Sequence, residues 1–191
     1  MNTQLRKVLV TGLAVLSVGW ISGKAQAAST DTITISLTPN TTFAVTISSP
    51  YVGGYNFGQV NLNSTTVSTL AITLTNSGSI YEYFGISVSS PTSGGWSPNS
   101  VGPSTDTFRL SGLLNAIGQG QPAPGSANFT ALTNTAPSTA SGKYGQGVTK
   151  TSPTAGNNQQ QLWLQMEMPF TLNSGGTGPQ TMTIRVTGQA T

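Results

Sequence analysis

The chain has 191 residues, of which 7 are Lys or Arg, 4 are Asp or Glu, and none is His or Cys. Such a composition leaves almost no groups that exchange protons, act as nucleophiles or bind metals near neutral pH. We therefore expect no enzyme activity, no catalytic residue, no metal site and no cofactor.

Residues 1–27 are predicted to form a secretory signal. Arg6 and Lys7 give the positive start, the apolar stretch 8–21 follows, and Ala25-Gln26-Ala27 supplies a small-residue cleavage site. The apolar stretch is shorter than the roughly 20 residues that a membrane-spanning helix needs. We expect cleavage, export to the cell surface or beyond, and no membrane insertion of the mature chain.

The mature chain is predicted to start near Ala28 and to carry no net charge. Three of the 7 basic residues lie in the signal, which leaves four basic and four acidic residues over 164 positions, 191 minus 27. A neutral chain without a Lys/Arg cluster lacks the positive surface that binds nucleic acid. Because no disulfide can form, residues 28–191 are expected to fold as one domain stabilised by packing alone.

Beyond the signal, apolar and polar residues alternate, which is typical of half-buried strands. The alternation is clearest where Leu162, Leu164, Met166 and Met168 share one face. About nine strands are predicted in all, and none of the sequence after the signal favours a helix. In chain order they cover residues 33–37, 43–47, 55–60, 70–74, 84–88, 108–110, 129–132, 162–168 and 182–186.

Many short strands with turn-rich connections predict an all-β fold. We favour an antiparallel β-sandwich, immunoglobulin-like or jelly-roll-like, over a barrel. The predicted core is Ile35, Val45, Phe57, Leu70, Ile72, Leu74, Phe84, Ile86, Leu110, Leu162, Leu164, Met166, Ile184 and Val186.

One long connection interrupts this pattern. Gly, Pro, Ser, Thr, Asn and Gln dominate residues 115–161, where few large apolar residues occur. Loops of this composition bury little apolar surface, and loops of this length are usually functional or partly disordered. We expect a polar, low-complexity connection inside the domain.

Two neighbouring segments resemble the immunoglobulin-like β-sandwich modules of bacterial surface and secreted proteins. They are Tyr55–Val60, with a Phe-Gly-x-Val strand, and Leu70–Ser79, with a strand that ends in Thr-Asn-x-Gly. Gly58 would allow a bulge or a close backbone approach beside Phe57, and Asn76-Ser77-Gly78 would turn the chain. The resemblance implies the fold and says little about function, because sandwiches have many functions.

The start of the mature chain resembles the donor strand of secreted fibre subunits. Ser29–Leu37 alternates polar and apolar residues, so Ile33, Ile35 and Leu37 lie on one face. In such assemblies an extended segment adds a strand to a neighbouring subunit's sheet, and every second side chain fills a pocket. The alternative is an ordinary first strand that pairs within its own domain.

Three aromatic residues offer a second possible site. Tyr81 and Tyr83 are predicted on one strand face, and Trp96 in an exposed Gly/Pro-rich turn, so that the rings could stack on a surface polysaccharide. The alternative is that these rings pack on a β surface, where aromatic residues are common. Trp163 is expected on the outer surface or in an interface.

The two glutamates, Glu82 and Glu167, lie at alternating polar positions of predicted strands. A glycosidase would need its two carboxylates roughly 5 to 10 Å apart. Neither glutamate has a neighbouring motif, so both are expected to be solvated.

These observations favour a secreted, non-enzymatic structural subunit of an extracellular fibre, pilus-like filament or matrix. A neutral surface of Ser, Thr, Asn and Gln lacks the charges that normally block pairing between sheet edges. We therefore expect self-association through strand addition. The alternative function is an extracellular carbohydrate-binding or adhesion module.

Overall fold

The structure is a computed structural model, and it describes residues 36–48, 54–93, 95–133, 151–173 and 178–189. The chain divides into two compact units, of which the first ends at Pro39 and the second starts at Asn40. All the strands described below belong to the second unit. The predicted signal and the predicted donor residues Ile33 and Ile35 lie outside the described residues.

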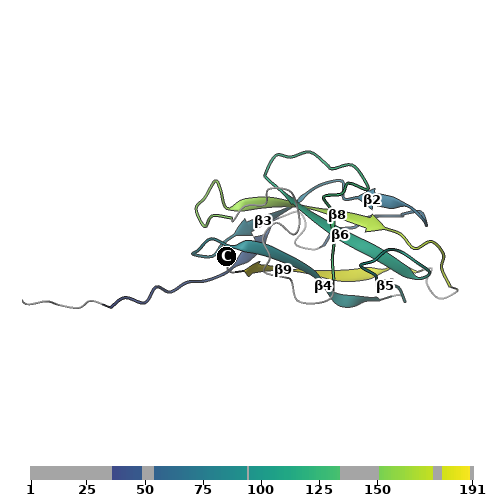
Figure 1. Cartoon of the computed structure of the whole chain (residues 1–191), viewed down its shortest axis with the longest axis horizontal. Helices are drawn as coiled ribbons and strands as arrows, with labels where there is room; N and C mark the ends of the chain where they lie inside the picture. The colour runs from purple at the N-terminus through teal and green to yellow at the C-terminus, as the bar shows by residue number, and fades with distance from the viewer. Residues whose placement is uncertain (1–35, 49–53, 94, 134–150, 174–177, 190–191) are drawn as a thin grey trace, which may run out of the picture. The chain divides into compact units, whose positions relative to one another are not determined.

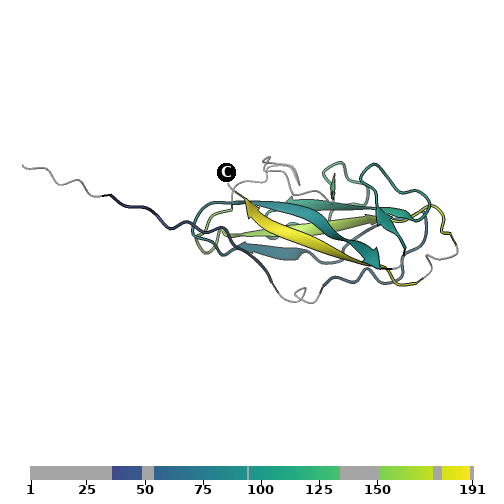
Figure 2. The same cartoon turned by 90° about the horizontal axis from the view of Figure 1, so that it is seen from below.

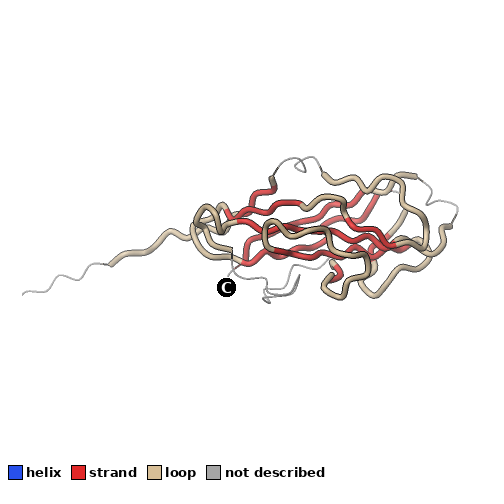
Figure 3. Tube along the Cα trace, turned by 90° about the horizontal axis from the view of Figure 1, so that it is seen from above, coloured by secondary structure: helices blue, strands red, loops and turns tan. Residues whose placement is uncertain are grey.

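The described residues contain strands and loops and no helix (Figure 3). The all-β prediction is confirmed for this part of the chain, where no helix could span a membrane. The strands are β1 (Val45–Ile47), β2 (Thr65–Val67), β3 (Ile72–Asn76), β4 (Tyr83–Ser93), β5 (Ser97–Pro98), β6 (Thr107–Asn115), β7 (Thr130–Ala131), β8 (Gln159–Glu167) and β9 (Thr181–Gln189).

The strands form two sheets that lie in two layers (Figure 1). The larger sheet has the order β1-β3-β8-β6-β5; β2 also pairs with β8, and β7 also pairs with β6. The smaller sheet consists of β4 and β9, which run antiparallel side by side (Figure 2). All described pairs of strands are antiparallel except β5 with β6.

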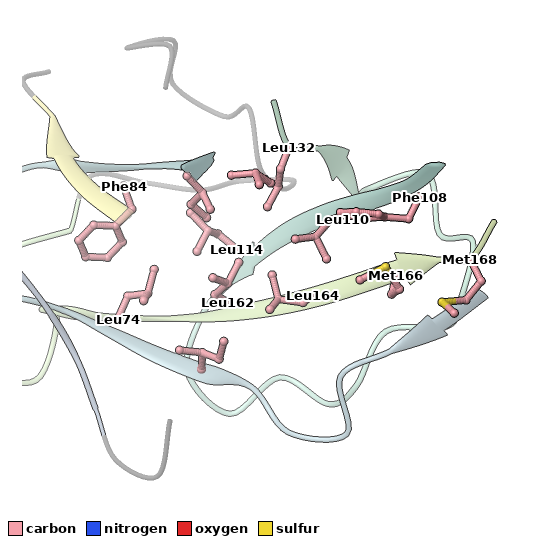
Figure 4. Packing of buried hydrophobic residues seen from close by; sticks show 13 residues of the cluster. Leu74, Phe84, Phe108, Leu110, Leu114, Leu132, Leu162, Leu164, Met166 and Met168 are labelled. Carbon is pink, nitrogen blue, oxygen red and sulfur yellow. The ribbon is translucent and has the colours of Figure 1, made fainter. Parts of the chain in front are cut away.

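The main core lies between these sheets. Phe84, Ile86 and Val88 of β4 point toward the leucines of β6 and β8, and each is at most 4% exposed. Figure 4 shows the row Leu162, Leu164 and Met166 along β8, with Phe84 and Leu74 at one end of the cluster and Met168 at the other; Leu114 belongs to the same cluster. Burial of one such side chain stabilises the fold by about 1.5 to 3 kcal/mol. The remaining members of this core are Ile72, Phe108, Leu110, Leu132 and Met168.

A second apolar cluster covers the outer face of the larger sheet. This outer cluster consists of the buried residues Val67, Leu113 and Trp163, with Ala71 and Phe129 packed against them. Trp163 is only 5% exposed, so its predicted place on the outer surface or in an interface is wrong. The sequence predicted that Trp163 lies in a strand, but it did not predict that a long loop, which carries Phe129, covers this side chain.

Polar contacts hold this loop on the sheet. The side-chain amide of Gln121 donates to the backbone oxygens of Val67 and Ser68, at 3.4 and 3.1 Å. The backbone N–H of Gly125 donates to Oε1 of Gln165 at 2.7 Å. The first part of the polar 115–161 segment is therefore packed on specific partners, and its last residues already belong to β8.

One predicted core residue, Leu70, is wrong, because it is 58% exposed. The strand prediction assumed unbroken alternation, but the chain is irregular between β2 and β3. There Ser68 bonds to Leu164 twice: its N–H donates to the Leu164 oxygen at 2.8 Å, and its Oγ accepts from the Leu164 N–H at 3.1 Å. Pairing with β8 passes from Val67↔Gln165 directly to Ile72↔Leu162, so the chain carries extra residues here, and Leu70 lies outside both strands and is exposed.

The segment that carries the family resemblance is partly as expected. Gly58 has a φ of 70°, which favours glycine, but residues 55–60 form a loop and not the predicted strand. Phe57 packs against the main core with its ring edge-on to Tyr55, at a centroid distance of 4.8 Å. The predicted turn after β3 is present, where Oδ1 of Asn76 accepts from the Gly78 N–H at 2.9 Å.

Candidate functional site

Two backbone hydrogen bonds show in which direction the residues of β4 point. The N–H of Val88 donates to the oxygen of Thr133 at 3.0 Å, and the N–H of Glu82 donates to the oxygen of Thr151 at 3.2 Å. Neither acceptor belongs to β9. Even-numbered residues from Glu82 to Val88 therefore direct their backbone groups away from β9.

Over part of β9, the opposite edge of the smaller sheet pairs with no described strand. The register is Phe84↔Gly188, Ile86↔Val186 and Val88↔Ile184. In an antiparallel ladder, residues directly opposite each other either bond together or both point away. Ile184, Val186 and Gly188 therefore point away from β4, and β9 pairs with no other described strand.

The first strand of the larger sheet, β1, also has backbone groups that point away from its neighbour. Ser48 donates to Thr73 at 3.0 Å, and the oxygen of Ala44 accepts from Ser77 at 2.9 Å. The residues between these positions alternate, so Val45 and Ile47 point away from β3. No described strand pairs with this side of β1. We call these parts of β1 and β9 the strand-pairing edges.

The strand-pairing edges belong to different sheets but come together at one end. Ala44 lies at the start of β1 and Gly188 near the end of β9. The side chain of Glu82 lies against Gly188 and close to the N–H of Ala44. An added strand could therefore pair with β9, with β1, or lie between them.

Apolar side chains along these edges are incompletely covered. Val45 and Ile47 of β1 and Ile184 and Val186 of β9 pack against the main core but are only partly buried. Neither strand contains proline, and Arg185 is the single charged residue in the two strands. The edges thus lack most of the features that usually prevent pairing with another chain.

The predicted donor residues are only partly visible. Leu37 is described, lies outside any strand and is 88% exposed. Ile33 and Ile35 lie outside the described residues, so their pairing remains a prediction.

The predicted sugar-stacking residues do not form one platform. Tyr81 is 55% exposed and precedes β4, and Tyr83 is the first residue of that strand. Trp96 follows the other end of β4. Because β4 has 11 residues, the ring of Trp96 lies on the order of 30 Å from the ring of Tyr83. Trp96 is also half-buried and packs on Phe108 at a centroid distance of 6.5 Å, so the prediction of an exposed ring is wrong.

The two glutamates lie at opposite ends of the larger sheet. Glu167 ends β8 and forms two hydrogen bonds with Arg109, at 2.7 and 2.6 Å. Glu82 bridges to Thr151, whose oxygen also accepts from Asn76, near the start of β8. The 9 residues of β8 separate these ends by about 25 Å, far more than a glycosidase pair allows.

Glu82 is not solvated as its alternating position suggested, because it is 0% exposed. Neither carboxylate oxygen has a hydrogen-bond partner among the described residues. Burial raises the pKa of Glu82, and the nearby N–H dipole of Ala44, which does not meet the geometry of a hydrogen bond, opposes this shift. Sequence alternation could not reveal this burial, since it depends on how β9 and β1 pack against the residue before β4.

No group of three or more His, Cys, Asp or Glu that could hold a metal ion occurs within the described ranges. No family model, curated protein or solved structure matches the chain.

Proposed function

We propose that this protein is a secreted structural subunit of an extracellular fibre, pilus-like filament or matrix, and that its copies join by strand addition. The observation that supports the proposal is the pair of strand-pairing edges. Backbone groups of β9 and β1 there pair with no described strand, and they lie beside apolar side chains that are only partly buried. Unpaired sheet edges readily pair with a strand from another chain.

The strand order adds support. In immunoglobulin-like domains, four strands in the order A-B-E-D face a sheet that contains C, F and G. Here β1, β3, β8 and β6 take the order A-B-E-D, and they face β4 and β9 at the positions of C and F. The position of G, next to β9, holds no described strand. We infer an immunoglobulin-like sandwich whose last strand comes from another copy.

The N-terminal segment has the sequence pattern that such an added strand needs. In an extended segment, Ile33, Ile35 and Leu37 point to one face. Turned inward, these side chains would cover the apolar residues along the strand-pairing edges. The backbone of the segment would bond to Val186 and its neighbours on β9.

Variants of the mature chain test the proposal. Ile35→Asp puts a charge on the inward face of the added strand, whereas Thr34→Asp puts the same charge on the outward face. We expect filaments from the unchanged protein and from Thr34→Asp, and none from Ile35→Asp, when concentrated samples are viewed by electron microscopy. Folded monomers from the unchanged protein at every concentration would contradict the proposal.

A change in the accepting edge should have the same effect. Val186→Pro removes an N–H that points away from β4, so the β4–β9 pair should persist. Arg185→Pro removes an N–H that faces β4 and should unfold the smaller sheet. We expect Val186→Pro to be a folded monomer that no longer extends filaments. Normal filaments from Val186→Pro would show that β9 is not the accepting strand.

Pairing within one chain is the competing arrangement. If residues 29–37 of the same copy cover β9, the protein stays monomeric and its sedimentation does not change with concentration. If another copy supplies the strand, the size of the particles rises with concentration and Ile35→Asp abolishes the rise.

A further inference from the structure

We propose that the buried carboxyl group of Glu82 is a proton-controlled switch for the strand-pairing edges. In its neutral form it lets β1 and β9 close together at the end where they meet. In its ionised form it forces this end open, so that the fold loses stability and the edges accept a strand less well. The assembly part of this inference rests on the proposed function, whereas the stability part does not.

The backbone of Glu82 is held in place just before β4. Its N–H and oxygen bond to the oxygen and N–H of Thr151, at 3.2 and 2.9 Å. The residue is 0% exposed, and its side chain reaches across to β9 and the start of β1. The carboxyl group therefore lies where three strands from both sheets come together.

Two glycines show how tightly this corner is packed. A Cβ at Gly188 would collide with the carboxyl group of Glu82. A Cβ at Gly78 would collide with the backbone of Thr42 and lie 3.0 Å from the nitrogen of Ala44. An ionised carboxylate needs hydrogen-bond donors or water, but both carboxyl oxygens of Glu82 are shielded from solvent and have no hydrogen-bond partner among the described residues.

No described charge compensates an ionised Glu82. On its own segment the titratable neighbours are Tyr81 and Tyr83, and on β9 the nearest is Arg185, which is exposed and three residues from Gly188. The described residues of β1, and those from 151 to 158, contain no titratable side chain. A buried carboxylate without a cation is so costly that the group keeps its proton or the structure opens.

The sign of the pH effect follows from this. The folded protein holds the proton more tightly than the unfolded chain, because burial raises the pKa of Glu82 above its ordinary value of 4.5. Stability is therefore complete below pH 4.5 and is lost as the pH rises through the folded pKa. This is the reverse of the usual behaviour of a paired carboxylate.

The first experiment measures the mature chain alone. Urea unfolding is followed at a series of pH values from 4 to 9 for the unchanged protein and for Glu82→Gln. Asp106→Asn, which removes a different carboxyl group, serves as the matched control. We expect the urea midpoint of the unchanged protein and of Asp106→Asn to fall with rising pH. Glu82→Gln, which keeps the shape of the neutral acid, should remove that fall.

A direct titration completes this test. The chain has only two glutamates, so ¹³C-labelled glutamate gives two carboxyl signals, which Glu82→Gln assigns. We expect the Glu82 signal to titrate with a midpoint above 4.5, the ordinary value for a glutamate. A titration midpoint of the Glu82 signal at or below pH 4.5 overturns the switch. A fall in the urea midpoint that is equal with and without Glu82 overturns it too.

The second experiment measures strand acceptance. A labelled peptide of residues 29–38 is added to the mature Ile35→Asp chain, which cannot donate its own strand. If acceptance needs the proton, the peptide's affinity falls by about tenfold per pH unit above the Glu82 pKa, and Glu82→Gln abolishes the fall. Binding that does not change with pH overturns the switch and leaves the proposed function standing. No binding at any pH overturns the proposed function, and the urea series then decides the switch alone.

Discussion

At the scale of single residues, Gly188 and Glu82 are the most informative pair. Sequence alternation places Glu82 at a polar strand position, which is typical of a solvated side chain. The structure instead buries it against a glycine of β9, 106 residues later (188 minus 82). Such a contact is invisible in the sequence, because nothing local connects the two positions.

This pair gives a prediction about stability. Gly188→Ala places a methyl group on the Glu82 carboxyl group, so it should destabilise the fold by about 1 to 3 kcal/mol, as overpacking usually does. In a Glu82→Ala background the collision is gone, and Gly188→Ala should cost much less. A double-mutant cycle by urea unfolding measures the difference. Equal costs in both backgrounds would show that the two side chains do not meet.

At the scale of elements, alternation located most of the strands. The apolar faces of β3, β4 and β8 follow the predicted period of two, because both sheets bury one face in the main core. It failed between β2 and β3, where extra residues interrupt the pairing with β8 and leave Leu70 exposed outside both strands. It also failed at Tyr55–Val60, where the apolar residues pack from a loop.

The loop after β6 shows a second limit of sequence analysis. Its polar composition predicted little burial, but Phe129 packs on the outer cluster beside Trp163, and Gln121 bonds to the sheet. A few well-placed residues are enough to fix a polar loop, and overall composition does not reveal them.

The outer cluster gives a prediction about this loop. Phe129→Ala should expose Trp163, since Phe129 is one of the residues that cover it. In a Trp96→Phe background of residues 28–191, Trp163 is the only tryptophan. We expect its fluorescence to shift to longer wavelength in Phe129→Ala, while far-ultraviolet circular dichroism keeps its strand signal. A fluorescence spectrum identical to that of the background protein would show that the loop does not shield Trp163.

At the scale of the whole molecule, the proposed assembly depends on which strand edges pair with no described strand. The sequence indicated a donor strand through Ile33, Ile35 and Leu37, but it could not indicate the accepting edge. Whether an edge is free depends on the order of strands in the sheets, and that order is set by contacts between distant segments. In the structure those edges belong to β1 and β9, the first and last described strands.

The most direct test of strand addition measures hydrogen exchange of individual backbone amides in the monomer and in the assembled protein. The amides of Ile184, Val186 and Gly188 point away from β4, whereas those of Arg185 and Thr187 face it and serve as controls. We predict fast exchange at the first three in the monomer and strong protection on assembly, with the two controls protected throughout. Equal exchange at Ile184, Val186 and Gly188 in monomer and assembly would contradict the account.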